Sequence, residues 1–334
     1  MVVGESGALP LPWIEPALRQ ALAAQRGHAL LLHASPGLGA LELAATLAQA
    51  WLCEAPSGPG TPVAAPAPCG RCAACRLVQA STHPDLRLLL PEEVALAHGL
   101  PVELDERRKP SRQIRMDDVR AALDWCVTTS GRGRGKVLVV HPATALNAVS
   151  ASALLKTLEE PPEGVRILLT AGDPTRLLPT LLSRCQRLRL HAPEPAQAVA
   201  WLQAQAVPDA PVLLAASGGL PLEAWRLHES GIGARQWESL PQGIQRGDPS
   251  CVEGWGVPRV VDALLKLCHD AGARRVGGVP RYFPASCLPL VDGLGALVAW
   301  QARLLALAAH AEHPWNEPLL LEALVLQGQA ALAA

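Results

Sequence analysis

Residues 28–52 read HALLLHASPGLGALELAATLAQAWL, and this stretch decides the fold. The apolar run HALLLH at 28–33 is followed by the turn SPGLG at 35–39, and apolar residues then recur with helical spacing over 41–52. A short apolar run bounded by turn residues is typical of a buried strand, and the later spacing is typical of a helix. The stretch therefore predicts a strand, a loop and a helix in direct succession.

Similar apolar runs continue along the first 190 residues. They lie at 85–90, 136–141, 165–170 and 186–190, and helical stretches separate them. Strands that alternate with helices predict an α/β domain whose parallel sheet is flanked by helices. The polar, Pro-bearing segment 92–113 interrupts the pattern and predicts a hairpin or mobile excursion.

Helix starts are marked by three polar residues. Asp117, Asn147 and Asp173 each precede a helical pattern, and Pro174 suits a first helical position. Asp and Asn are favoured N-caps because their side chains accept a hydrogen bond from the first free backbone N–H groups. We therefore expect helices to begin directly after these residues.

Three domains follow from where the alternation of strands and helices ends. A chain of 334 residues is long enough for more than one hydrophobic core. We predict an α/β domain over 1–191 with an insertion at about 53–80, a small helical unit over 192–240, and an all-α domain over 241–334. Residues 241–248, which carry Gly, Pro and Gln, are interpreted as the linker between the last two.

Bulk properties narrow the class of protein. The formal net charge of -1 gives no overall attraction to nucleic acid. The first residues lack the pattern of a signal peptide, and no charge-free apolar run of about 18 residues occurs, so we expect a cytoplasmic protein without a membrane partner. Nine cysteines in such a chain favour free thiols and a metal site over a disulfide framework.

A cysteine motif gives the strongest local signal for chemistry. Cys69, Cys72 and Cys75 form CxxCxxC, and Cys53 precedes them by sixteen positions. Four thiolates suit a tetrahedral zinc ion, and no open coordination position or acidic base accompanies them. The sequence predicts a structural Zn²⁺ that holds the insertion together.

Other interpretations of these cysteines remain open. The motif also begins a four-iron cluster signature, but that signature needs a further Cys-Pro shortly afterward, where Gln79 and Ala80 stand. Unliganded thiols are a second alternative. His83 competes with Cys53 as the fourth zinc ligand.

The loop at 34–41, ASPGLGAL, has the shape of a phosphate-binding GxxxxGK(S/T) loop without its chemistry. Gly37 and Gly39 are kept, but Ala40 stands where Lys contacts phosphate and Leu41 where a hydroxyl holds Mg²⁺. We therefore expect no ATP or Mg²⁺ to bind there. An ordinary strand-to-helix turn is the alternative.

Three further places could carry charge or catalysis. His141 follows the run KVLVV where an NTPase of this type needs an acidic pair, and we give it no role. The basic residues of GRGRGK at 131–136 are interpreted as a solvated turn. Arg184 ends a helix, where it either caps the carbonyls or reaches a neighbouring subunit's phosphate.

Three motifs taken together, LLKTLEEPP at 154–162, RILLT at 166–170 and LSRCQ at 182–186, resemble the delta-prime subunits of bacterial DNA polymerase III clamp loaders. The resemblance spans most of residues 10–230. It implies a RecA-like AAA+ domain, a small helical lid over 192–240, and a C-terminal collar domain over 241–334. It also implies that Arg184 acts in trans on ATP held by the adjacent subunit.

The same resemblance implies partners and a non-catalytic role. The partners would be the tau/gamma and delta subunits of a hetero-pentameric ring, with the sliding clamp and primer-template DNA reached through that complex. Thr170 matches the sensor-1 position, and Pro221 stands where active members carry the sensor-2 arginine. The chain would then belong to a DNA-directed DNA polymerase holoenzyme, a nucleotidyltransferase, without being the polymerase.

Two alternatives from other classes stay open. One is a divergent AAA+ ATPase acting on DNA, which the residues at 40, 41 and 141 argue against because phosphoryl transfer needs groups that they lack. The other is a nucleic-acid-binding module centred on the cysteines and on 131–136, which the neutral net charge disfavours.

Overall fold

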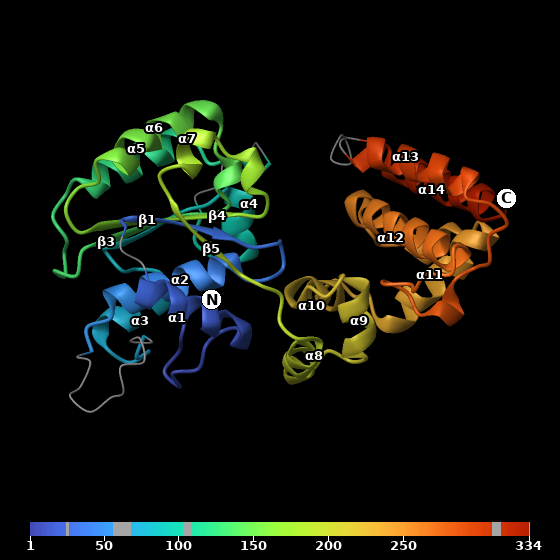
Figure 1. Ribbon diagram of the computed structural model, residues 1–334, viewed down its shortest axis with the longest axis horizontal. Coiled ribbons are helices and arrows are strands. Elements are labelled where there is room, and N and C mark those ends of the chain that lie inside the picture. Colours follow the sequence, from blue (N-terminus) through green and yellow to red (C-terminus); the bar gives the residue numbers. More distant parts are fainter. Residues whose placement is uncertain (25–26, 56–67, 103–108, 309–314, 334) are drawn as a thin grey trace. The chain divides into compact units, whose positions relative to one another are not determined.

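The computed structural model describes residues 1–24, 27–55, 68–102, 109–308 and 315–333. They form two compact units, Met1–Pro193 and Glu194–Ala334, which are described separately (Figure 1). Among these residues, no helix combines the length and the apolar character that a membrane span requires.

The first unit is built on a five-stranded parallel sheet. Its strands are β1 (Ala29–His33), β2 (Leu86–Leu89), β3 (Lys136–Val140), β4 (Val165–Ala171) and β5 (Gln186–Arg189), in the order β2-β3-β4-β1-β5. Its helices are α1 (Glu15–Ala24), α2 (Ala40–Leu52), α3 (Ala73–Gln79), α4 (Glu92–Ala97), α5 (Met116–Cys126), α6 (Ala148–Glu159) and α7 (Pro179–Leu182). Short 3-10 turns lie at Pro12–Ile14, Ala143–Ala145 and Pro174–Arg176.

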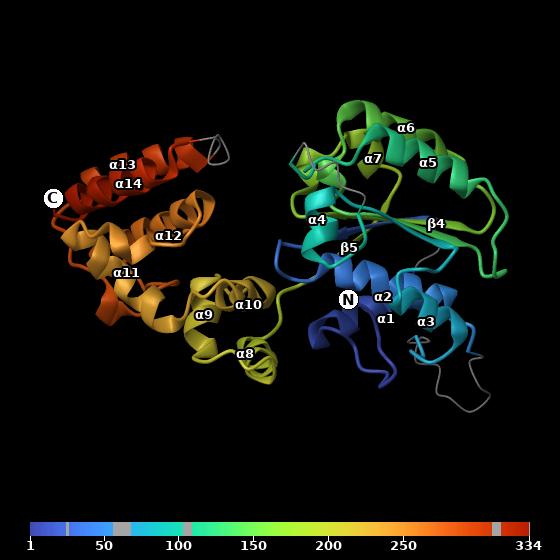
Figure 2. The ribbon, with the colours of Figure 1, turned by 180° about the vertical axis from the view of Figure 1, so that it is seen from behind.

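Helices cover both faces of this sheet. α5, α6 and α7 lie over one face, and α1, α2 and α3 lie over the other (Figures 1 and 2). The central strands are accordingly buried along almost their whole length, as in β3, where all five residues are buried. Continuous apolar runs suit strands that are buried on both faces, which is why the sequence marks them so clearly.

All five expected strands are present. The hairpin expected within 92–113 and the N-cap expected at Asp117 are wrong, and the alternative of a mobile excursion at 92–113 stays a prediction. Residues 92–113 do not form a hairpin where the structure describes them, because α4 occupies their beginning and buries Ala95; residues 103–108 lie outside the described residues. Asp117 is not an N-cap, because α5 begins at Met116 after Arg115. Asn147 and Asp173 are N-caps as predicted, accepting bonds from the backbone N–H groups of Ser150 and Thr175.

In its described residues, the second unit has helices as its only regular secondary structure. It contains α8 (Pro195–Ala204), α9 (Ala210–Ala216), α10 (Pro221–Glu229), α11 (Ala234–Arg246), α12 (Val257–Arg275), α13 (Gly295–Ala308) and α14 (Glu317–Leu332), with 3-10 turns at Pro249–Val252 and Ala285–Cys287. One apolar cluster joins α8, α9 and α10. A larger one joins α11 to α14 around the buried indoles of Trp237 and Trp300.

The predicted linker at 241–248 is wrong. α11 runs unbroken through Pro241 to Arg246, and it ends at Gly247, whose φ of 71° lies in the left-handed region. Its apolar face, with Trp237, Leu240 and Ile244, is buried and holds the helix in place despite the proline. The predicted boundary at 240/241 therefore falls inside a helix, and the division into a lid and a collar stays a prediction.

Candidate functional site

The loop between β1 and α2 has the turn of a phosphate-binding loop, but apolar side chains pack against it. Gly37 and Gly39 have φ values of 84° and 90°, and a Cβ built on Gly39 would lie 2.2 Å from Cδ1 of Leu11. Leu41 is buried in the core, and Ala40 carries only a methyl group. Neither side chain offers a ligand to phosphate or Mg²⁺, and weak or absent nucleotide binding stays a prediction.

The ends of β3 and β4 hold a polar pair. Nδ1 of His141 lies 2.7 Å from Oγ1 of Thr170, which is buried in β4. No carboxylate follows β3, so these two residues offer a metal ion only one ring nitrogen and one hydroxyl. In the second unit, Pro221 is the buried first residue of α10.

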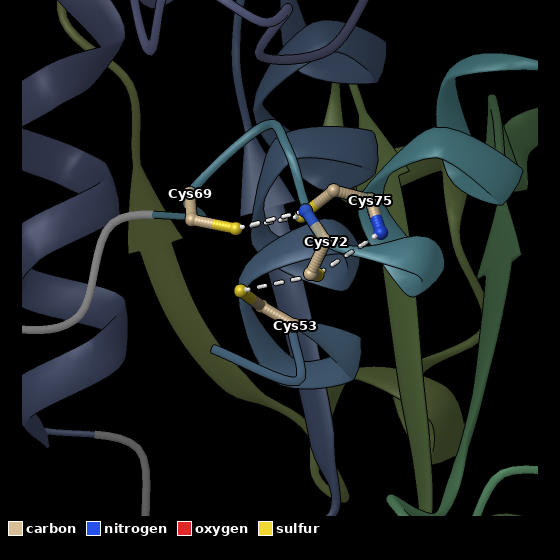
Figure 3. A group of neighbouring side chains, drawn as sticks. All are labelled: Cys53, Cys69, Cys72 and Cys75. Atoms are coloured by element: carbon tan, nitrogen blue, oxygen red, sulfur yellow. Dashed lines mark hydrogen bonds between the residues drawn. The ribbon is translucent and has the colours of Figure 1, made fainter. Parts of the chain in front are cut away.

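The four predicted cysteines come together in one group (Figure 3). Their sulfur atoms all lie within 4.8 Å of one another, and the pairs Cys53–Cys72 and Cys69–Cys75 are each separated by 3.9 Å. A tetrahedral zinc ion with Zn–S bonds of about 2.3 Å needs sulfurs about 3.8 Å apart. The group can therefore hold a metal ion without a large rearrangement.

Local structure explains how these sulfurs converge. Cys53 is the C-cap of α2, and Cys72 is the N-cap of α3, with Cys75 in the first turn of that helix. The Cys72 and Cys75 backbone N–H groups donate to the sulfurs of Cys69 (3.3 Å) and Cys72 (3.4 Å). These hydrogen bonds favour thiolates, because each places a partial positive charge beside sulfur.

The sulfurs differ in their readiness to ionise. Burial disfavours the thiolate of Cys69, but the N–H groups of Arg71 and Cys72 outweigh it and lower the pKa of Cys69 to about 6. Burial raises the pKa of Cys53 and of Cys75. Without a metal the group thus shares protons, and a bound divalent cation would displace them.

His83 does not join the cysteine group. Its ring is buried, and Nδ1 accepts a hydrogen bond from the backbone N–H of Asp85 at 3.0 Å. Burial also lowers the pKa of His83, which favours the neutral ring. Of the two residues that the sequence offered for the fourth position, Cys53 is the one that lies beside the other three sulfurs.

An ion pair ties the cysteine group to the basic loop before β3, a link that the sequence did not reveal. Oε1 of Glu54 accepts a bond of 2.6 Å from Nε of Arg132, and the Glu54 backbone N–H points at the Cys72 sulfur (3.5 Å). The buried carboxylate of Asp85 accepts the N–H groups of Gly131 (2.7 Å) and Arg132 (2.8 Å). The loop is therefore held through the side chain of Arg132 by Glu54 and through its backbone by Asp85.

The turn predicted for 131–136 is exposed over residues 131–134, as expected, but Lys136 at its end is not solvated. Lys136 is buried, donates to the backbone oxygen of Trp125 at 2.7 Å and lies over the Trp125 ring. Arg132 is paired with Glu54, so only Arg134 among the three basic residues lacks a protein partner in the described part of the chain. A single free cation gives little support to a nucleic-acid site here.

Arg184 lies just after α7 and is tied to α6. Its guanidinium forms an ion pair with Glu159, the last residue of α6, and Nη1 donates to the backbone oxygen of Thr180 at 2.8 Å. The side chain is about one third exposed, so it remains accessible from solvent. Glu159 belongs to the LLKTLEEPP motif, but nothing in the sequence indicated that it would meet Arg184.

Comparisons with known sequences agree on one group of proteins. A family model described as "DNA polymerase III, delta subunit" matches residues 14–194. DNA polymerase III subunit delta' of Pseudomonas aeruginosa is 40% identical over 228 residues, which cover 67% of this chain and 62% of that protein. The same subunit of Yersinia pestis is 33% identical over 280 residues, covering 79% and 72%. The match thus spans less than two thirds of the Pseudomonas protein.

A solved structure supports the fold. A DNA polymerase III gamma subunit-related protein from Thermotoga maritima superposes with a TM-score of 0.50 at 15% identity, covering 95% of this chain and 99% of that chain. At this identity the likeness establishes the fold alone. The parallel sheet flanked by helices and the helical C-terminal region agree with the AAA+ fold that the sequence predicted.

Proposed function

Because this chain belongs to the DNA polymerase III delta' family, we propose that it is a non-hydrolysing subunit of a clamp loader. In this role it supports ATP-dependent loading of a sliding clamp onto primed DNA, in the cytoplasm. One observation carries the proposal, and it is a contrast between two places in the first unit. Arg184 is present and partly exposed, whereas Ala40 and Leu41 provide neither the ammonium group nor the hydroxyl of a working phosphate loop. The chain thus has the group that acts on a neighbour's ATP and lacks those that act on its own.

Arg184 is suited to act in trans. A guanidinium stays protonated and presents several donors in one plane, which matches the oxygens of a phosphoryl group. An arginine finger supplied by a neighbouring subunit is worth roughly 10³ to 10⁵ in rate. Supplying such a finger requires no nucleotide on the chain that carries it.

The test is ATP hydrolysis by the purified chain alone and after mixing with tau/gamma and delta subunits, sliding clamp and primed DNA. We expect no hydrolysis by the isolated chain. In the mixture, Arg184→Ala should lower the clamp- and DNA-stimulated rate by about tenfold or more, because the transition-state charge loses a partner.

Arg187→Ala is the matched control, because Arg187 is exposed, lies three residues further along the chain and makes no ion pair in the described residues. Its rate should equal that of the unchanged protein. An unchanged rate with Arg184→Ala would return Arg184 to the role of a helix cap. Robust hydrolysis by the isolated chain would instead support a divergent AAA+ ATPase acting on DNA.

We also infer that the cysteine group binds Zn²⁺ in a structural role. Four cysteine sulfurs at tetrahedral spacing match a closed zinc site and leave no coordination position for a substrate. The residues that would hold the ion are Cys53, Cys69, Cys72 and Cys75. When bound, the ion supplies crosslinks between the end of α2 and the start of α3.

The second unit supports assembly into a ring. α13 contains only two polar side chains, Gln301 and Arg303, yet Val298 and Leu305 on it are 60% and 56% exposed. Exposed apolar side chains two turns apart on one helix mark a surface suited to another protein. We propose that α13 contacts the tau/gamma or delta subunits in a hetero-pentameric collar.

A further inference from the structure

The hydrophobic core fixes the positions of the backbone segments that carry Glu159 and Arg184. Leu158, which precedes Glu159, is 1% exposed, and Cys185, which follows Arg184, is 9% exposed; both belong to one apolar cluster. α6 and α7 also pack side by side (Figures 1 and 2). The two charged side chains therefore meet because their backbones are fixed, although they lie twenty-five residues apart.

The guanidinium of Arg184 is only partly occupied by these contacts. Nη1 donates to the Thr180 oxygen (2.8 Å) and to Oγ of Ser183 (3.3 Å), and Nη2 donates to Oε1 of Glu159. Arginine carries five N–H donors. Nε and one N–H of Nη2 therefore remain without an acceptor among the described residues, available to an incoming oxyanion.

We propose that Glu159 is a positioning residue for Arg184, a role that rests on the proposed function in trans. A free arginine side chain samples many rotamers, and it must lose that freedom when it contacts a phosphoryl group in the transition state. Glu159 and the end of α7 restrict the side chain in advance, so less freedom is lost during the reaction. Glu159 acts through Arg184 and touches no reacting atom itself.

The oxygen and the negative charge of Glu159 should affect the reaction in different ways. A carboxylate beside Arg184 repels an incoming phosphate. What positions the guanidinium is therefore the acceptor oxygen of Glu159, and the negative charge is not needed for this role. Glu159→Gln keeps an acceptor oxygen on a side chain of the same length, and Glu159→Ala removes it. A positioning role therefore predicts that the two variants differ.

The experiment measures kcat and KM for ATP in the complex assembled with tau/gamma and delta subunits, clamp and primed DNA. Glu159→Ala should lower kcat by about three- to tenfold with KM unchanged, because the transition state alone uses the held geometry. Glu159→Gln should keep most of the rate. Glu160→Ala is the matched control, because the adjacent Glu160 side chain makes no contact of this kind in the described residues.

A double variant separates positioning from general damage. Adding Glu159→Ala to Arg184→Ala should slow the complex no further, since Glu159 acts only through the arginine. Equal rates for Glu159→Ala and the unchanged chain, or faster ones, would overturn the positioning role while leaving the proposed function intact. A full rate with Arg184→Ala would overturn both.

Discussion

A single buried carboxylate organises a loop of the second unit at the residue scale. Asp270 is fully buried, and its oxygens accept backbone N–H groups of Arg281 (2.9 Å), Tyr282 (2.6 Å) and Phe283 (2.8 Å). The ring of Phe283 stacks on Trp237 with centroids 4.7 Å apart. Asp270 thereby fixes the path of a non-helical segment against the core of α11 and α12.

Asp270→Asn should destabilise the second unit by about 2–4 kcal/mol. The amide keeps one acceptor oxygen, but its NH₂ group faces backbone donors that then lose their partner. Urea unfolding followed by tryptophan fluorescence measures the change, since Trp237 lies in the affected core.

The control for Asp270 is Asp262→Asn. The Asp262 side chain is 59% exposed and pairs with Lys266 on the surface of α12, so its loss should shift the midpoint little. If Asp270→Asn unfolds at the same urea concentration as the unchanged chain, the carboxylate does not hold the loop.

Helix caps show what single residues reveal in a sequence. Asn147 was identified correctly, and its Oδ1 accepts the backbone N–H of Ser150 at 2.8 Å. Asp117 was identified wrongly as a cap. Acidic residues are also favoured in the first helical turn, where their negative charge interacts favourably with the helix dipole without capping the helix. Asp117 and Asp118 both lie in that turn of α5, and sequence alone does not separate the two roles.

The strands could be predicted from the sequence because each is a continuous apolar run between turn residues. The end of α11 could not, because residues 241–248, which include Pro241 and Gly243, were interpreted as a linker. Gly243 serves a different purpose: a Cβ there would lie 2.4 Å from Cβ of Cys251, so the residue permits a close approach. The spacing of Trp237, Leu240 and Ile244 was the signal for a continuous helix.

The site was predictable where its residues are close in sequence. Three of the four cysteines form a local motif, and metal chemistry limits how such a motif can be used. The contacts of Arg132 with Glu54 and of Arg184 with Glu159 join different elements, 78 and 25 residues apart. Only the fold brings these charges together, so no pattern in the sequence could show them.

At the element scale, metal removal should loosen α3. The purified chain should contain about one equivalent of Zn²⁺ by elemental analysis. Chelation should raise amide hydrogen exchange in residues 69–79, because the metal ties the start of α3 to the end of α2. Lowering the pH should also release the ion, since protons compete for the thiolates, and raising it should restore binding.

Cys75→Ser and Cys287→Ser form a matched pair for this test. Cys75 is buried within the sulfur group, whereas Cys287 lies in the second unit outside it. The first substitution should abolish or greatly weaken zinc binding, and the second should leave the metal content unchanged. Full zinc content with Cys75→Ser would show that the four sulfurs are not the ligand set.

At the scale of the whole molecule, the two units carry different parts of the proposed function. The family match at residues 14–194 coincides almost entirely with the first unit, which holds the cysteine group and Arg184. For the second unit, the proposed role in assembly is argued from its surface. On that surface, Val298 and Leu305 of α13 are exposed, and burying such apolar side chains against another protein is favourable.

Replacing both Val298 and Leu305 with Glu should weaken assembly with the tau/gamma and delta subunits by about tenfold or more, because two charges would be buried in an apolar contact. The unit itself should stay folded, since both side chains are largely exposed. Light scattering on mixed subunits measures the complex, and circular dichroism verifies the helices. Val127→Glu is the control, because Val127 is 73% exposed at the end of α5 in the first unit. A complex of normal mass from the doubly substituted chain would exclude α13 as the assembly surface, and loss of assembly with Val127→Glu alone would place that surface on the first unit.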